Sequence, residues 1–534
     1  MPVTPTYPGV YIEEIPSGVR TIMGVATSIT ALIGRAVKGE TNEPKSVMNY
    51  GEFTRLFGGL HVDFPMSYAV KDFFLNGGGQ AVIVRLFKKG AKLAKATLTK
   101  GTLKFEAASE GGWANTLRIR VDSQVSQDVA DTYGLAKTDL FNLTVYDTKT
   151  GESEVFLNLS VKESPARADR VLKARSSLLR VSTALGLNTS PTAVPAAHTK
   201  DAAAGKTIWT DPQCSTGVAP GDVADNGVAL DKATYEGDKI LKTGLYALDK
   251  VDIFNLLCIP ADTRGGDTQK EVYQTALKYC VDKRAMLIVD PPAAWTKPDD
   301  ITKTNFQALT DLGLSGTAAR NAAIFFPRIV QADPLRKDQL DVFVPSGAIA
   351  GIFSRTDAAR GVWKAGAGVD AAVSGIQSLA VSLTDEENGT LNPIAVNCLR
   401  TFPLVGSVVW GGRTMRGADV QADEYKYCCV RRLALYLEES VLRASKWIIF
   451  EPNDEPLWAQ IRLNVGVFMH DLFRQGAFQG TNPRDAYFVK CDKETNPQSE
   501  IDKGIVNIVI GFAPLKPAEF VIIKIQQLAG QLKA

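Results

Sequence analysis

The sequence predicts a multidomain chain of the α+β / α/β class. We expect a discontinuous α/β sheet domain that carries an inserted β-rich domain, and a C-terminal α+β domain. Three observations predict this arrangement. Short apolar runs alternate with helical periodicity over residues 23–92 and again over 243–395, alternating strands fill residues 93–242 between them, and an apolar extended segment lies near each end of the sequence. With roughly 100–200 residues per domain, 534 residues correspond to about three or four domains.

Residues 1–22 are predicted to form an extended N-terminal arm. Four prolines exclude a helix there: Pro2, Pro5, Pro8 and Pro16. The segment also contains an apolar extended run, which a frayed tail has no reason to carry, made of Val10, Tyr11, Ile12 and Ile15. This run therefore needs a strand partner.

The α/β domain is predicted over residues 23–92 and 243–395. In its first part, a helix over 66–75 ends at the Asn-Gly-Gly-Gly sequence of residues 76–79 and lies between buried strands at 29–33 and 81–87. After the insertion, we expect a helix over 269–283 and strands at 251–259, 285–289 and 322–326.

The insertion, residues 93–242, is predicted to be β-rich and to lie on the outside. Its expected strands span 117–121, 141–146 and 154–159, and a short helix is expected over 168–179. Residues 185–238 are rich in Ala, Gly, Thr, Asp and Pro, which is typical of a long surface excursion.

Residues 396–512 are predicted to form the C-terminal α+β domain, and residues 513–534 a C-terminal arm. One amphipathic helix presents Cys429, Leu433, Tyr436, Leu437, Val441, Ala444 and Ile448 on a single face. A second helix begins at the Asn-Asp-Glu-Pro signal of residues 453–456. Two apolar strands are expected after it, at 505–512 and 519–525.

Composition excludes several classes of protein. The 60 Lys and Arg residues nearly balance the 58 Asp and Glu residues, so the net charge of +2 argues against a nucleic-acid coat or a polybasic membrane binder. No stretch approaches the roughly 18 apolar residues of a membrane span, and the opening ten residues lack the features of a secretory signal. The seven scattered cysteines favour reduced core thiols over a disulfide framework, and we expect a cytosolic, reducing origin.

The sequence offers little catalytic chemistry, and we expect no catalytic, cofactor-binding or metal-binding residues. The Ala-Gly-Lys-Thr sequence of residues 204–207 fails as a phosphate loop because position 200 is Lys200 instead of glycine. The histidines, His61, His198 and His470, lie far apart, and vicinal Cys428 and Cys429 are better explained by packing.

Two features stay open at this point. Asp290 follows a predicted parallel strand, where α/β enzymes often keep a catalytic acid, but a turn-forming aspartate before two prolines is the simpler interpretation. The Trp-Lys-Ala-Gly-Ala-Gly sequence of residues 363–368 fits either a ligand loop or an interdomain turn.

The two apolar terminal segments point to assembly. In a monomer each segment would leave backbone donors and acceptors unpaired, and strand addition to a neighbouring copy solves this. The donor strand and the acceptor sheet lie on different faces, so the contact is heterologous and builds rings or helical assemblies.

Several stretches, in order along the chain, resemble the contractile tail sheath proteins of myophages and related injection machines. They span nearly the whole chain outside the insertion: residues 7–14 (YPGVYIEE), 28–36 (SITALIGRA), 53–59 (FTRLFGG), 361–365 (GVWKA), 391–394 (LNPI), 406–414 (GSVVWGGRT), 427–433, 450–453 (FEPN) and 520–526.

The resemblance implies a structural, non-enzymatic subunit without cofactors, located in a virion tail and synthesised in the host bacterial cytoplasm. It implies hexameric rings that stack helically around an inner tail tube and contract to drive the tube through the target cell envelope. The other implied partners are baseplate and tail terminator proteins, with neither nucleic acid binding nor direct membrane insertion. A phage tail, a bacteriocin and another injection system remain open, as do a monomeric carbohydrate-binding or adhesive protein and an α/β enzyme with a site near Asp290.

The resemblance also assigns roles to particular residues. Arms of neighbouring subunits complete a sheet in the C-terminal domain, which faces the tube, and charged residues of the first C-terminal helix either pair between subunits or form a solvated face. The implied inter-subunit residues are Val10, Tyr11, Ile12, Glu13 and Ile15 in the N-terminal arm, Phe520, Val521, Ile522, Ile523 and Ile525 in the C-terminal arm, and Ile505, Val506, Ile508, Val509 and Ile510 in the acceptor sheet, with hinges at Pro16, Gly18, Pro514 and Pro517.

Overall fold

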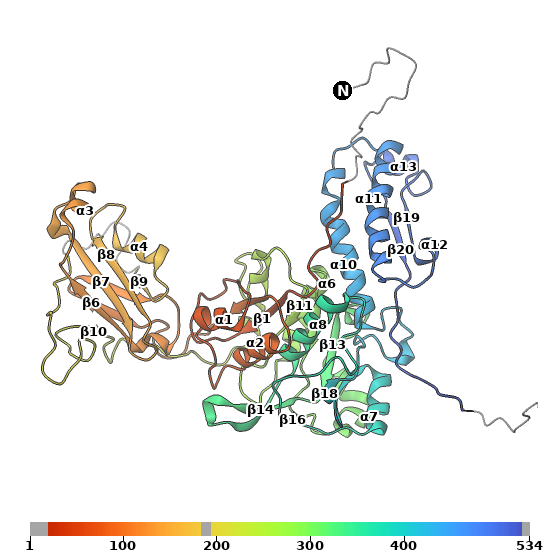
Figure 1. The fold of residues 1–534 in the computed structure, drawn as a ribbon, viewed down its shortest axis with the longest axis horizontal. Helices are drawn as coiled ribbons and strands as arrows, with labels where there is room; N and C mark the ends of the chain where they lie inside the picture. Colours follow the sequence, from red (N-terminus) through yellow and green to blue (C-terminus); the bar gives the residue numbers. More distant parts are fainter. Residues whose placement is uncertain (1–19, 183–193, 526–534) are drawn as a thin grey trace, which may run out of the picture.

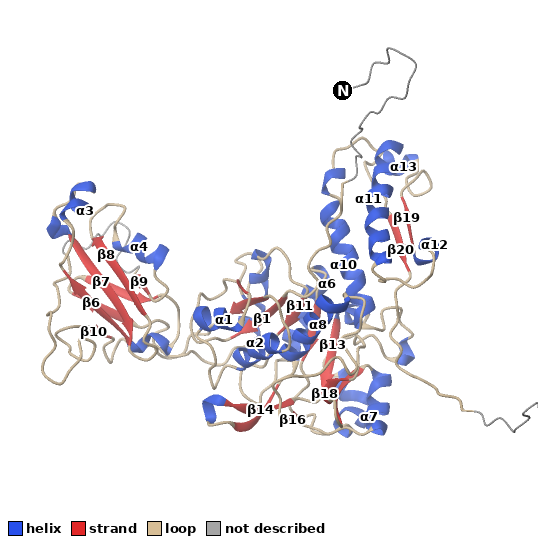
Figure 2. Ribbon diagram, viewed as in Figure 1, coloured by secondary structure: helices blue, strands red, loops and turns tan. Residues whose placement is uncertain are grey.

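The computed structural model describes residues 20–182 and 194–525. The predicted N-terminal arm residues 10–15 and the hinges Pro16 and Gly18 lie outside this range. A β-rich unit stands beside a central α/β unit, and a mainly helical unit stands on the other side of the centre (Figures 1 and 2). Within the described residues, no helix is long and apolar enough to cross a membrane.

The central unit is built on an eight-stranded sheet in the order β18-β17-β13-β12-β11-β1-β3-β2. Pairing is parallel from β17 to β3 and antiparallel at both edges. The strands are β1 (Thr30–Gly34), β2 (Lys45–Val47), β3 (Ala81–Arg85), β11 (Leu256–Cys258), β12 (Met286–Val289), β13 (Ala322–Phe326), β17 (Val396–Phe402) and β18 (Gly406–Val409). Thr30 of β1 pairs with Leu256 of β11, so strands from either side of the insertion lie next to each other, as a discontinuous domain requires.

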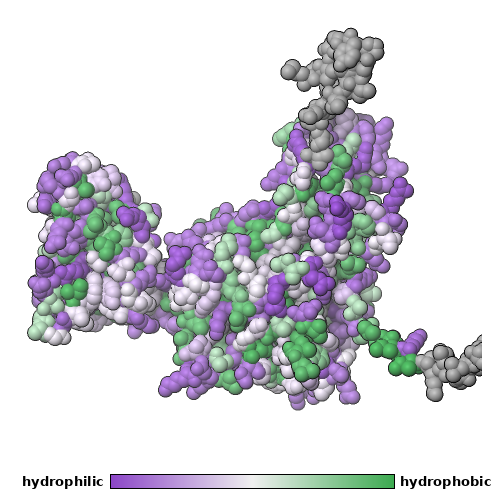
Figure 3. Space-filling view, viewed as in Figure 1, coloured by the Kyte–Doolittle hydropathy of each residue, from purple (hydrophilic) through white to green (hydrophobic). Residues whose placement is uncertain are grey.

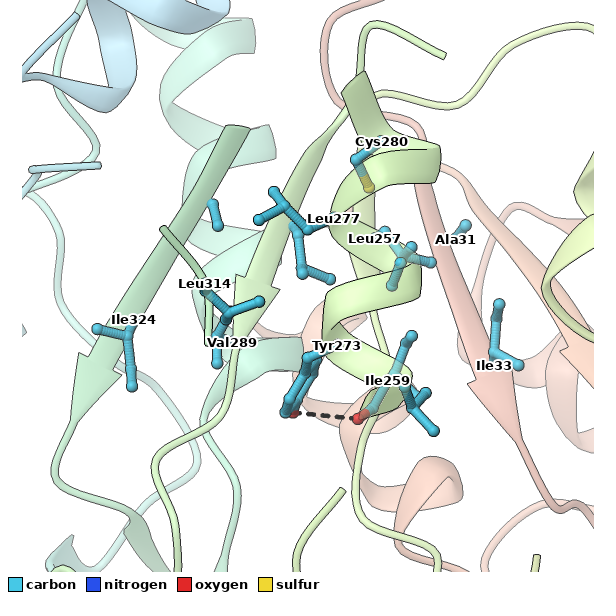
Figure 4. Packing of buried hydrophobic residues seen from close by; sticks show 14 of the residues in the cluster. Ala31, Ile33, Leu257, Ile259, Tyr273, Leu277, Cys280, Val289, Leu314 and Ile324 are labelled. Carbon is cyan, nitrogen blue, oxygen red and sulfur yellow. Dashed lines mark hydrogen bonds between the residues drawn. The ribbon is translucent and has the colours of Figure 1, made fainter. Parts of the chain in front are cut away.

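Helices cover both faces of the central sheet. On one face, α2 (Pro65–Leu75) packs against α8 (Ser346–Arg360), and a Cβ added at Gly347 would lie only 2.1 Å from the Ala69 carbonyl oxygen. On the other face, α6 (Lys270–Asp282) packs its apolar residues on the strands, and its Tyr273 hydroxyl donates to the Ile259 carbonyl at 3.4 Å (Figure 4). The remaining elements of this unit are α1 (Tyr50–Phe57), α5 (Lys232–Glu236), α7 (Asp299–Thr310), α9 (Asp385–Leu391), β14 (Ile329–Asp333), β15 (Gln339–Phe343) and β16 (Ser378–Leu379).

Two predicted domain boundaries need correction. The C-terminal domain was expected to begin at residue 396, but β17 and β18 extend the central sheet because Ile324 of β13 pairs with Val396 of β17. The insertion was expected to run to residue 242, but Leu230 and Tyr235 already pack in the central core. The strand predicted over 251–259 forms only over Leu256–Cys258, and residues 251–255 connect it to a 3₁₀ helix over Gly244–Lys250.

The β-rich unit has its own apolar core between two sheets. Its elements are β4 (Thr97–Lys100), β5 (Leu103–Ala107), β6 (Leu117–Asp122), α3 (Gln127–Thr132), β7 (Leu140–Asp147), β8 (Ser153–Ser160), α4 (Ala168–Arg175), β9 (Leu179–Val181) and β10 (Thr216–Gly217). The helix predicted over 168–179 ends at Arg175, because Leu179 enters a strand pairing with Ala107. Arg85 joins this unit to the central sheet: its guanidinium is buried and donates to the Glu110 backbone oxygen at 2.7 Å.

The helical unit consists of α10 (Cys428–Ala444), α11 (Glu455–Arg474), α12 (Pro483–Ala486), β19 (Tyr487–Lys490), α13 (Gln498–Ile501) and β20 (Val509–Phe512). Both predicted amphipathic helices are confirmed, and Asp454 caps α11 by accepting from the Leu457 amide. The strand predicted over 505–512 forms only over Val509–Phe512, because the Asn496 side chain holds both the amide and the carbonyl of Asn507. The strand predicted over 519–525 is not formed within this chain, since its residues make no ladder with the described part.

Candidate assembly interface

The C-terminal unit presents a two-stranded sheet against α11. Tyr487 of β19 pairs with Phe512 of β20 in an antiparallel register, and neither strand pairs with any further strand among the described residues. The side chains of Tyr487, Val489, Ile510 and Phe512 pack on the α10–α11 core. A two-stranded sheet is marginal by itself, and its outer edges offer unpaired backbone groups to another strand.

The predicted acceptor residues lie in and just before β20. Val509 and Ile510 are in the strand, whereas Ile505, Val506 and Ile508 precede it. Val506, Ile508 and Ile510 pack against the C-terminal core, and Ile505 and Val509 are about 40% exposed (40% and 43%). The segment thus has one anchored and one open side.

The predicted C-terminal arm is exposed over residues 520–525. Five apolar side chains between positions 520 and 525 are 74–92% exposed: Phe520, Val521, Ile522, Ile523 and Ile525. The segment extends away from the body and is apolar where it leaves it (Figures 1 and 3). A row of exposed apolar residues of this length is unusual in a monomer and marks an interaction site.

The root of this arm is fixed at two points. At the first, the Ala513 amide donates to the Ala486 carbonyl at 2.8 Å, and Pro514 forms a bridge with Phe478. At the second, the Arg413 guanidinium donates to both carboxylate oxygens of Glu519, Nε at 2.8 Å and Nη2 at 2.6 Å. Pro514, one predicted hinge, therefore lies in paired backbone, and Pro517, the other, lies between two fixed points.

The N-terminal root, residues 20–25, runs along α10 and α11. The Arg20 amide donates to the Asn464 side chain at 2.9 Å, and the Arg20 guanidinium lies 4.5 Å from the centre of the Trp447 ring. Ile22 is buried in the same core, and the Val25 amide donates to the Ser440 hydroxyl at 3.2 Å. The chain then continues into β1 of the central sheet.

The charged residues of α10 pair within the chain. Arg432 forms a salt bridge of 2.5 Å with Asp357 of α8, and both side chains are at most 5% exposed. Arg443 reaches Asp252 at 2.7 Å, and Glu439 accepts from Arg284 at 3.4 Å. Arg431 pairs with Glu438 at 3.2 Å. Arg432, Arg443 and Glu439 therefore attach α10 to the central unit, so this face of the helix is not simply solvated. Pairing of these charges between subunits stays a prediction.

Asp290, the residue that suggested an enzyme, caps a helix. Its carboxylate accepts from the Ser346 amide at 2.9 Å and the Ser346 hydroxyl at 2.8 Å, at the first residue of α8. Burial raises the pKa of Asp290 to about 7, although the Ser346 hydrogen bonds lower it. With Asp290 only 6% exposed, its carboxyl group serves packing and capping.

Other candidate features have structural roles. All seven cysteines are free and buried, and burial raises the pKa of the Cys428 and Cys429 thiols. Among the described residues, no three His, Cys, Asp or Glu side chains gather as a metal site would require. Residues 363–365, 367 and 368, from the stretch whose role the sequence left open, line a cavity of about 650 Å³ whose wall also includes residues 515–520.

Sequence reasoning missed the residues that hold the two roots. Arg413 and Asn464 are single polar residues, one in a loop and one on a largely apolar helix face, and both are buried. Their partners are 106 and 444 positions away. The available signal was an arginine in the otherwise small and apolar stretch 406–414, and a lone asparagine between apolar positions of α11.

Comparison with known proteins identifies this architecture. Residues 420–527 match the family model of the phage tail sheath C-terminal domain. The tail sheath protein of Vibrio phage KVP40 is 28% identical over 177 residues, which are 33% of this chain and 25% of that protein. This chain thus matches about a quarter of the length of that relative.

Solved structures match over nearly the whole chain. The helical sheath of the anti-feeding prophage in its contracted state has a TM-score of 0.54 at 21% identity, covering 98% of this chain and 100% of that chain. The PVC sheath complex of an extracellular contractile injection system, also in its contracted state, has a TM-score of 0.54 at 20% identity, and the match covers 99% of both chains. The sheath tail protein of Listeria innocua has a TM-score of 0.59 at 12% identity, and the match covers 92% of this chain and 96% of that chain. The chain therefore has the fold of these sheath proteins, and its residues 420–527 match the model of the phage tail sheath C-terminal domain.

Proposed function

We propose that this chain is the structural subunit of a contractile sheath. Subunits assemble as stacked hexameric rings around an inner tail tube, and contraction of the sheath drives the tube through the target cell envelope. One observation carries the proposal: the exposed apolar segment 520–525 ends a module that matches the sheath C-terminal domain and that also holds a two-stranded sheet with open edges.

Strand addition between copies explains both features. The arm of one subunit adds to the β19–β20 sheet of a neighbour, where Val509 and Ile510 lie in the receiving strand and Ile505, Val506 and Ile508 precede it. Each backbone hydrogen bond gained contributes about 0.5–1.5 kcal/mol, and burial of the apolar side chains adds about 25 cal/mol per Å². A link of this kind is directional and strong, so it holds while other contacts change.

The roots lie at different ends of the C-terminal unit. Arg20 contacts Trp447, in the 3₁₀ helix that follows α10, whereas Glu519 contacts Arg413 beside the central sheet. Arms that leave a body at two separate places connect it to different neighbours, which yields a continuous mesh. The buried Arg432–Asp357 pair supports movement of the central and C-terminal units as one body during contraction.

The remaining assignments follow from the sheath function. The partners are further copies of the chain, an inner tube protein, and baseplate and tail terminator proteins. The location is a virion tail, after synthesis in the host cytoplasm. We assign the chain no catalytic role and no cofactor.

Negative-stain electron microscopy of three purified variants tests this proposal. The full-length chain is expected to form tubes or stacked rings, and deletion of residues 520–534, which retains Glu519, is expected to abolish them. The control replaces two exposed apolar residues of the central unit, Ile240 (90% exposed) and Leu241 (71%), with serine, and should still assemble. Normal tubes from the deletion variant would overturn strand exchange by the C-terminal arm. A full-length chain that stays monomeric would favour a monomeric adhesive protein that uses its β-rich unit.

A further inference from the structure

We infer that Arg413 and Glu519 form a clamp that attaches the C-terminal arm to the central sheet, so that the arm pivots at Phe520. The hinge of the C-terminal arm is therefore assigned to Phe520, beyond the predicted hinge residues Pro514 and Pro517. The inference deepens the proposed function and rests on it for its biological meaning, because it assigns the residues that direct the arm toward a neighbour.

The first part of the argument is the geometry of the pair. Arg413 is fully buried, and its side chain in the Glu519 pair is 1% exposed against 15% for Glu519. Two parallel hydrogen bonds join the groups, which is the strongest and most orienting form of this contact. Burial alone would lower the pKa of Arg413, but the hydrogen bonds and charges of Glu519 and Asp419 outweigh it and raise that pKa.

The second part is the rigidity of Arg413 itself. Its Nη1 donates to the Asn392 carbonyl and to Asp419, both at 2.9 Å. Its backbone amide and carbonyl are both held by the side chain of Asn397, at 2.6 and 2.8 Å, and Asn397 is a fully buried residue of β17. The guanidinium therefore points at Glu519 from a fixed place on the central sheet.

The third part is the path of the chain. Residues 513 and 514 are paired to the C-terminal unit, and Glu519 is held by the central unit, so residues 515–518 bridge the two. Tension on the arm then reaches the Arg413 pair before it reaches β20. The clamp protects the short β19–β20 sheet from being pulled apart when neighbouring subunits move.

Distance measurements between two spin labels test the clamp. Labels are attached at Val369→Cys (55% exposed) and Ile523→Cys (79% exposed), and all seven native cysteines are buried. The distance between the two labels is measured by pulsed electron paramagnetic resonance on the dilute, unassembled full-length chain. Glu519→Ala is expected to broaden the distance distribution about 1.5-fold, since the flexible stretch before the label grows from about four to about nine residues and its spread follows the square root of length.

Two variants keep the test informative. Glu386→Ala changes an exposed carboxylate of α9 and should leave the distribution unchanged. Glu519→Gln keeps the shape but not the charge, and should give an intermediate width. Circular dichroism shows whether each variant is folded. Equal widths for the parent and folded Glu519→Ala would overturn the clamp. Broadening in a chain that never forms tubes would uphold the clamp while refuting the sheath proposal.

Discussion

The two arm roots are held by opposite kinds of chemistry. The N-terminal root is held by neutral hydrogen bonds to Asn464 and Ser440 and by burial of Ile22, so it is part of the C-terminal core. The C-terminal root is held by backbone pairing at residues 513 and 514 and, beyond them, by one buried ion pair, Arg413 with Glu519, outside that core. Releasing the first root means opening packed apolar surface, whereas releasing the outer part of the second means separating two side chains. The C-terminal arm is therefore the one that can be redirected locally.

Removal of the clamp arginine should give the largest effect. Arg413→Ala removes the two hydrogen bonds to Glu519 and those to Asp419 and the Asn392 carbonyl, and leaves Lys426 as the remaining cation near both carboxylates. Loss of one partner from a buried ionic cluster typically costs about 3–5 kcal/mol of the free energy of unfolding. Urea denaturation measures it. Arg336→Ala, which breaks an exposed pair with Asp341, is the control and should cost less than about 1 kcal/mol. Equal losses in the free energy of unfolding for Arg413→Ala and Arg336→Ala would show that the buried Arg413 cluster stabilises the chain no more than a surface ion pair does.

The pH dependence of unfolding tests a buried carboxyl group of the central unit, away from both arm roots. Asp72 of α2 is fully buried, accepts one hydrogen bond from Gln331 at 2.6 Å, and has a second carboxylate oxygen with no partner in the described chain. Burial raises its pKa from 3.8 to about 7. The folded state therefore binds the proton more tightly than the unfolded state, so this stability is present below pH 4 and lost as pH rises to 7, at up to about 1.4 kcal/mol per pH unit.

The matching variant is Asp72→Asn, whose amide does not titrate. Its free energy of unfolding, measured by urea denaturation at several pH values, should gain on that of the parent chain between pH 4 and pH 7. The gain should also appear in a chain that carries Glu519→Ala, because the clamp lies elsewhere. A parallel pH dependence of Asp72→Asn and the parent would show that Asp72 is not the group responsible.

A methyl group at Gly24 should strain the N-terminal root. A Cβ there would lie 2.0 Å from the Tyr436 hydroxyl oxygen and 2.9 Å from its Cζ. Overpacking of this kind costs about 1–3 kcal/mol, so Gly24→Ala should lower the thermal midpoint. Tyr436→Phe removes the nearest atom and should recover part of the loss in the double variant. Full additivity of the two changes would contradict this contact.

The smallest effect is expected from the asparagine that holds residue 20. Asn464→Ala removes the hydrogen bond to the Arg20 amide, which is worth about 0.5–1.5 kcal/mol. Trypsin should then cleave faster after Arg20, as followed by mass spectrometry of the released peptide. Gln460→Ala, an exposed change on the same helix, is the control. An unchanged cleavage rate would mean that Ile22 and Trp447 hold the root without Asn464.

Predictability from sequence followed the strength of the local pattern. The strand at 322–326 and the helices α10 and α11 have strong periodicity and are confirmed, and the strand predicted over 81–87 forms over Ala81–Arg85. The edge strands β2 and β18 are short and are fixed by their neighbours in the sheet, so no local signal marked them. The buried pairs Arg413–Glu519 and Arg432–Asp357 join residues far apart in sequence. A single polar residue forms no periodic pattern, so neither pair could be predicted from the sequence.

The sequence by itself determined where the apolar extended segments lie and that the chain alternates between sheet and helix, because side-chain period and proline placement act locally. Only the tertiary structure decided that β17 and β18 belong to the central sheet, that Asp290 caps α8, and that Glu519 meets Arg413. Strand pairing and buried ion pairs depend on which distant residues are brought together, and that is a property of the packed chain. Residues 519–525 show the limit most clearly, since their apolar pattern favours a strand but forms no ladder within the described chain.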